Sequence, residues 1–158
     1  MGNFRIAGPL DEANRKIAGT ILQATLTNLL DLSLIAKQAH WNVVGPNFRS
    51  VHQQLDEVVE LARRHADAVA ERASAIGVPP DGRARTIAEH SGLPAVSEGW
   101  ALDSDVVQAV GAVLGELIKR MRTWIDETDK ADLVSQDLLI EIAGELEKQY
   151  WMWQAQQL

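Results

Sequence analysis

Two histidines and three acidic residues are spaced in a way that favours metal binding. His40 and His52 are followed by Asp56, and Asp67 and Glu71 come further along the same segment. His52 and Asp56 are four residues apart, as are Asp67 and Glu71, so each pair shares one helix face. The chain has no cysteine, which excludes disulfides, thiolate zinc sites and iron–sulfur clusters. Any bound metal must therefore be held by imidazole and carboxylate groups.

The elements that position these residues are predicted to be long helices, which makes the fold class all-α. Apolar residues recur every three or four positions in four segments, at about 10–40, 48–76, 103–128 and 131–155. A crossover at 77–102, with a short helix near 86–90, joins the two helical hairpins. This connectivity is that of a ferritin-like four-helix bundle, and the 158 residues are predicted to form one domain with a short N-terminal extension at 1–9.

Turn and capping residues mark the helix boundaries. Gly45 and Pro46 end the first hairpin's leading helix, and Asn47 is the expected N-cap of the following one. Asp103 or Ser104 is the expected N-cap of the third long helix.

The candidate ligands form two half-sites that are too far apart to meet in one chain. The Glu-x-x-His pair that ferritin-like bundles place on inner helix faces is absent. Asp56 and Asp67 are eleven residues apart, or about 16 Å along a helix axis, several times a metal–ligand distance. The half-sites meet only if a second copy lies antiparallel. A twofold dimer is therefore predicted to build two identical centres.

Other readings remain open for individual residues. Carboxylates on a helix flank are often solvated, and a histidine beside Trp41 is often packed. Glu60 lies on the same flank as Asp56. It could be an accessory ligand, but a solvated acid is the favoured interpretation. His65 and His90 have no acidic partner at ligand spacing and are predicted to lie on the surface.

The segments around the ligands resemble the Dps family of mini-ferritins. The matching stretches are Lys37–Phe48, His52–Asp56, Asp67–Arg72 and Leu146–Met152. The resemblance covers roughly residues 10–155. It implies a hollow homo-dodecamer of four-helix protomers.

The same resemblance implies the chemistry. His40, His52 and Asp56 of one subunit and Asp67 and Glu71 of its partner would form a ferroxidase centre. The centre would oxidise Fe(II), preferably with hydrogen peroxide, and store the ferric mineral in the shell. Trp41 would lie near the iron, with a second role as an electron donor.

A concentrated acidic segment is the candidate route for cation entry. Between residues 126 and 147 there are eight acids against one base, Lys130. The family has acidic threefold pores near this junction, and negative walls concentrate Fe(II). The candidate pore residues are Asp126, Asp129, Asp132 and Asp137, although a solubilising surface with helix N-terminal acids is the alternative.

The charge balance argues against direct nucleic-acid binding. The net charge is −7, only Arg5 is basic within residues 1–9, and no cation follows Lys148. The cluster at 119–122 is predicted to be an exposed helical face. Direct DNA binding is therefore not expected, and the alternatives to a ferroxidase are a nucleoid-compacting particle and a helical scaffold with unused ligands.

Hydropathy predicts no membrane attachment. The longest uncharged stretch, 17–30, is shorter than the roughly 20 apolar residues of a membrane span. The start at Met1 has no apolar run typical of a signal peptide. A cytoplasmic protein is predicted, with nucleoid association left open.

Overall fold

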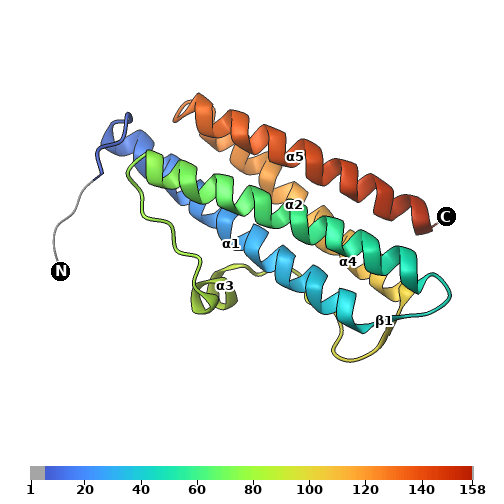
Figure 1. Ribbon diagram of the computed structural model, residues 1–158. Coiled ribbons are helices and arrows are strands. Elements are labelled where there is room, and N and C mark those ends of the chain that lie inside the picture. Colours follow the sequence, from blue (N-terminus) through green and yellow to red (C-terminus); the bar gives the residue numbers. More distant parts are fainter. Residues whose placement is uncertain (1–5, 158) are drawn as a thin grey trace.

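Two helical hairpins joined by a crossover form the molecule, which confirms the predicted all-α, ferritin-like bundle (Figure 1). The computed structural model describes residues 6–157. Within this range the long helices are α1 (Glu12–Asn42), α2 (Phe48–Ala75), α4 (Asp103–Thr128) and α5 (Leu133–Gln154). The crossover carries α3 (Ala84–His90), and the chain also has strands β1 (Val43–Val44) and β2 (Ala101–Leu102) and a 3-10 helix, η1 (Ala155–Gln157). Of the expected extension at 1–9, residues 1–5, including Arg5, lie outside the described residues.

Apolar side chains from all four long helices meet in one core. Fully buried members include Leu22 of α1, Leu55 of α2, Leu114 of α4 and Trp153 of α5. Burying one such aliphatic side chain stabilises the fold by about 1.5–3 kcal/mol. The three- and four-residue spacing in the sequence is what brings these residues onto one face of each helix.

The first helix is apolar for a structural reason. By length and composition α1 could cross a membrane, since an 18-residue window has a mean hydropathy of 1.2. In the folded chain 61% of that window is buried. The hydroxyls of Thr25 and Thr27 donate to the carbonyls of Ile21 and Gln23, so α1 buries polar side chains without leaving them unpaired. Its composition is that of a helix packed on several sides.

Side-chain hydrogen bonds to backbone fix the crossover on the bundle. The Gln23 amide donates to the Asp81 carbonyl at 2.9 Å and accepts from the Asp81 N–H at 2.8 Å. The Arg120 guanidinium donates to Asn28 Oδ1 at 2.8 Å and to the carbonyl of Ser91 at 2.6 Å. The prediction that 119–122 is an exposed face was therefore wrong for Arg120, because its donors satisfy crossover carbonyls.

The two short strands tie the end of the crossover to the first hairpin. β1 and β2 pair in parallel, with Val43 opposite Ala101 and Val44 opposite Leu102. The end of the crossover therefore lies beside the turn between α1 and α2, where two of the predicted ligands are.

Replacing Arg120 with methionine should destabilise the fold by about 2–3 kcal/mol, because buried carbonyl and amide acceptors lose a charged donor. Urea unfolding measures the loss. The matched control is Arg122→Met, since Arg122 is 68% exposed and pairs with Glu147 on the surface, where ion pairs contribute at most about 1 kcal/mol. Equal losses in both variants would contradict the proposed role of Arg120.

Candidate metal centre

His40 and His52 bind each other's backbone across the α1–α2 hairpin. His40 is near the end of α1 and His52 is in the second turn of α2. His40 Nδ1 is 2.8 Å from the carbonyl oxygen of His52, and His52 Nδ1 is 2.9 Å from the carbonyl oxygen of His40. Their rings stack with centroids 3.6 Å apart, and Phe48 packs 5.0 Å from His52. The hairpin therefore holds both imidazoles in one fixed arrangement.

This arrangement decides which ring nitrogen is free. A carbonyl oxygen only accepts, so each Nδ1 must carry the proton. In the neutral ring Nε2 then keeps its lone pair. Metal-binding histidines generally donate their other ring N–H to such an acceptor. His40 and His52 are therefore prepared to act as ligands through Nε2.

Asp56 lies one turn beyond His52 and is paired with a lysine. Lys37 Nζ is 2.5 Å from Asp56 Oδ1, and His40 Nδ1 is 3.4 Å from the same oxygen. The hydrogen bond from Lys37 lowers the pKa of the Asp56 carboxyl below its ordinary value, more than the slight burial raises it. When protonated, His40 and His52 would act in the same direction as Lys37. The ammonium group of Lys37 thus neutralises the Asp56 carboxylate.

Asp67 and Glu71, the second predicted half-site, lie apart from the first three candidate ligands. Both are exposed on α2, and neither side chain makes a hydrogen bond or ion pair with another of residues 6–157. In that described part of the chain no group of three His, Asp or Glu side chains lies close enough to hold a metal ion. The three residues near the hairpin and the two acids further along α2 are not brought together within one chain.

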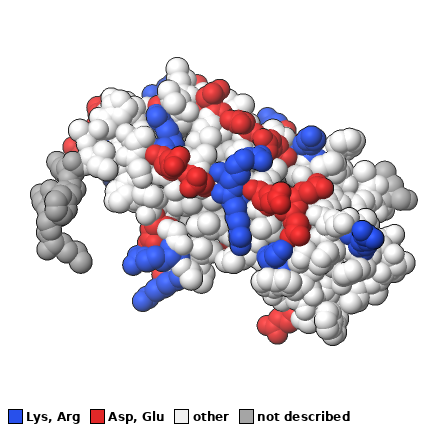
Figure 2. All heavy atoms as spheres, viewed as in Figure 1, with Lys and Arg blue, Asp and Glu red and all other residues white. Residues whose placement is uncertain are grey.

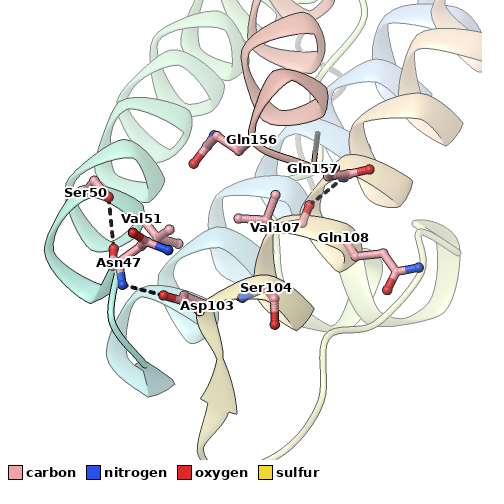
Figure 3. A pocket seen from close by; sticks show the side chains of 9 residues that line it. All are labelled: Asn47, Ser50, Val51, Asp103, Ser104, Val107, Gln108, Gln156 and Gln157. Carbon is pink, nitrogen blue, oxygen red and sulfur yellow. Dashed lines mark hydrogen bonds between the residues drawn. The ribbon is translucent and has the colours of Figure 1, made fainter.

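Asp103 fastens the hairpin turn to the start of α4. Its buried carboxylate accepts from the N–H of Asn47 at 2.5 Å and from the N–H of Ser104 at 2.8 Å (Figure 3). Gly45, at φ +128°, lies so close that a Cβ there would be 2.8 Å from the carboxylate. A side chain at position 45 would both strain the backbone and displace Asp103.

Two predicted N-caps work differently from expectation. Asn47 is the N-cap residue of α2, as predicted, but its side chain makes no capping bond, and its backbone N–H donates to Asp103. Leu102 is the N-cap of α4, and Asp103 is its first helical residue.

A shallow cavity of about 560 Å³ opens over the two imidazoles. It is lined by His40, Trp41, Val43, Val44, Gly45, Phe48, His52 and Trp100. Trp41 is 63% exposed. Trp100 was missed in the sequence because it stands 60 residues from His40, and only the pairing of β1 with β2 brings it here. Lys37 was also missed, although its spacing of three from His40 places it on the same side of α1.

The other histidines and Glu60 differ in their surroundings. His65 is buried, and its Nε2 is 3.3 Å from Glu145 Oε2, so the predicted surface location was wrong. The cause is α5, which covers this flank of α2. His90 and Glu60 are exposed.

The acidic candidates near the α4–α5 junction separate into two groups. Asp126, Asp129 and Asp137 are exposed. Asp132 is buried, caps α5 through the N–H groups of Val134 and Ser135, and pairs with Arg72 at 2.6 Å. Burial raises the pKa of Asp132, but hydrogen bonds from Arg72 and Ser135 outweigh it and lower the pKa. We therefore leave Asp132 out of any pore.

Acidic and basic side chains are interleaved on the face that shows α2 and α5. Figure 2 shows no large basic area on this face, and its end near β1 and the C-terminus is mostly uncharged. Exposed apolar side chains are present at that end: Trp41, Val44, Phe48, Trp100 and Leu102.

Comparison with known proteins gives one consistent result. The family model for the ferritin-like domain matches residues 20–157. A DNA protection during starvation protein of Mycolicibacterium smegmatis is 40% identical over 159 residues, which cover 98% of this chain and 84% of that protein. Dps from Microbacterium arborescens in the high iron form superposes with a TM-score of 0.90 at 35% identity, over 96% of this chain and 98% of that one. A tetragonal form of Mycobacterium smegmatis Dps gives a TM-score of 0.91 at 38% identity, over 99% of this chain and 94% of that one.

Replacing Lys37 with methionine should raise the pKa of Asp56 toward its ordinary value of 3.8, because the largest lowering contact is lost. A lowered folded-state pKa stabilises the fold above the unfolded pKa, and this contribution disappears as the pH falls through the folded value. The stability difference from the parent should be constant above about pH 5 and vanish in stronger acid. For this half-exposed pair it should not exceed about 1 kcal/mol.

Carbon-13 NMR of the Asp56 carboxyl in metal-free protein follows the titration, and urea unfolding at several pH values follows stability. Lys16→Met, at an exposed lysine on the same helix, is the control and should leave Asp56 unchanged. An unaltered Asp56 titration in Lys37→Met would refute the pairing.

Asp103→Ala should cost about 1–3 kcal/mol, because the N–H groups of Asn47 and Ser104 lose their acceptor. Asp103→Asn keeps an acceptor oxygen and should cost less. Asp105→Ala is the control, since Asp105 is an exposed acid in the same first turn. Thermal unfolding compares the three, and a loss at Asp105 as large as at Asp103 would contradict the role of Asp103.

Proposed function

The chain belongs to the Dps family of ferritin-like proteins, and we propose that it is a ferroxidase that removes Fe(II) and hydrogen peroxide together. In this proposal His40, His52 and Asp56 of one subunit and Asp67 and Glu71 of a second subunit bind the iron. Trp41 stands beside the centre as a residue that absorbs stray oxidising equivalents.

The observation that carries the proposal is the state of the two imidazoles. Both Nδ1 atoms are engaged by carbonyl oxygens, which leaves both Nε2 atoms for a cation. Two histidines that served only to pack the hairpin would not need reciprocal hydrogen bonds that place the proton on Nδ1 in both rings. The exposed Asp67 and Glu71 would supply the acids that one half-site lacks, at about 16 Å and about 22 Å along the helix axis from Asp56.

The donor set suits iron in both oxidation states. Imidazole and carboxylate accept Fe(II), and carboxylates also tolerate the harder Fe(III). Two Fe(II) ions, one hydrogen peroxide and two protons give two Fe(III) ions and two water molecules. Delivering both electrons at one centre avoids release of hydroxyl radical. Lys37 contacts one oxygen of Asp56, and in this proposal it moves away as the metal binds, so the site exchanges one cation for another.

We propose a homo-dodecamer that holds the ferric mineral in its shell, in the cytoplasm. Exposed apolar side chains near the half-site, such as Phe48 and Leu102, would be covered by the second subunit. Asp126, Asp129 and Asp137 are the proposed lining of the iron entry path, since they are exposed and negative.

Nucleoid compaction is the second candidate, because the relatives include proteins named for DNA protection. Direct binding through the 119–122 cluster is not favoured, since Arg120 binds the crossover and Arg122 pairs with Glu147. A gel shift at low salt without magnesium tests whether the protein binds DNA directly, and retarded DNA would favour nucleoid compaction.

Complementation between half-sites tests the shared centre. Asp56→Ala and Glu71→Ala should each abolish the fast rise of ferric absorbance after Fe(II) and peroxide are mixed. When the two variants are assembled together at equal amounts, random pairing should restore about a quarter of the centres, because a mixed dimer has one intact site and one doubly damaged site.

The matched control assembles Asp56→Ala with His52→Ala. Both changes damage the same half-site, so no mixed dimer contains an intact centre and no rate should return. The shared centre would be refuted if the fast rate returned in this control. It would also be refuted if the rate did not return in the first mixture although mixed assembly had been verified.

A further inference from the structure

Trp100 is a second large indole at the candidate centre, contributed by the crossover. It lines the same cavity as His40, Trp41 and His52. It is 76% exposed in the single chain, more than Trp41 at 63%. The two tryptophans come from segments that are far apart in the sequence and converge on one pair of imidazoles.

The position of Trp100 is fixed from both sides of the cavity. It immediately precedes β2, whose Ala101 pairs with Val43 of β1. Three residues later Asp103 binds the N–H of Asn47 in the hairpin turn. Backbone pairing and a buried carboxylate therefore hold this end of the crossover against the half-site.

The composition leaves few other one-electron donors. The chain has no cysteine and a single tyrosine. That tyrosine, Tyr150, is on α5 and packs against Gly115 of α4 inside the second hairpin. Tryptophan is thus the oxidisable side chain available at the centre.

Incomplete loading of the centre creates a need for such a donor. With one Fe(II) bound, hydrogen peroxide can take only one electron from iron, and a second must come from elsewhere. We propose that Trp100 supplies this electron, an inference that rests on the proposed ferroxidase function. One Fe(II), one hydrogen peroxide, one proton and the indole give one Fe(III), two water molecules and a neutral tryptophanyl radical. The indole N–H proton supplies the fourth hydrogen of the two waters.

Oxidation of Trp100 should depend on the centre and not only on exposure. Trp151 of α5 provides the comparison, since it is 65% exposed but does not line the cavity. An exposed indole attacked by diffusing radicals would be oxidised at both positions. An indole that donates to the centre would be oxidised at Trp100 and spared at Trp151.

The experiment uses the assembled protein with one Fe(II) per centre and hydrogen peroxide. Electron paramagnetic resonance after rapid freezing detects the radical, and peptide mass spectrometry locates the added oxygen. We expect oxygen at Trp100 and little at Trp151, with loss of both the radical and the Trp100 product in the Asp56→Ala, Glu71→Ala double variant. In Trp100→Phe the radical signal should fall and spin-trapped hydroxyl radical should rise, whereas Trp151→Phe should match the parent.

Each outcome has one meaning. Equal oxidation of Trp100 and Trp151, or Trp100 oxidation that persists in the double variant, would overturn the inference and assign the damage to exposure. A radical confined to Trp41 would overturn it as well. Iron oxidation by the parent at two Fe(II) per centre is measured in the same samples: its absence defeats the ferroxidase proposal, whereas its presence without Trp100 oxidation defeats only this inference.

Discussion

The reciprocal hydrogen bonds between the two imidazoles and the two backbone carbonyls are the constraint on which the candidate centre depends. They join the end of α1 to the second turn of α2 and set the tautomer of both rings. One contact thus closes the hairpin and prepares the ligands. A histidine held only by packing would keep two tautomers and two ring orientations, and part of the binding free energy would be lost in selecting one.

The rest of the fold keeps that hairpin in place. Asp103 binds the turn, β2 pairs with β1, and Arg120 and Gln23 hold the crossover against the bundle. Apart from the backbone pairing of the strands, these contacts join side chains to backbone, and all of them connect residues far apart in sequence. They explain how an irregular connection of more than twenty residues can deliver Trp100 to a defined position.

Sequence periodicity was sufficient for the fold class because apolar residues recur every three or four positions in each long helix, as Leu55 and Leu114 illustrate. Ligand spacing was sufficient to separate the two half-sites, because an α-helix has a fixed rise. The roles of His65, Arg120 and Asp132 depend on which neighbour covers them, and one helix's pattern does not contain that information. Strands of two residues have no periodic signal, so the route of Trp100 to the cavity was not predictable.

The proposed centre, divided between subunits, would couple metal binding to assembly. A cation that binds only the paired subunits stabilises that pairing in proportion to the logarithm of its free concentration. Without metal, Lys37 neutralises Asp56, whereas Asp67 and Glu71 stay solvated and need no partner. The single chain therefore carries no buried unpaired charge at either half-site, which avoids the large cost of desolvating one. Dividing the ligands in the proposed way would let the protomer fold before the metal arrives and would still present a complete donor set once two copies meet.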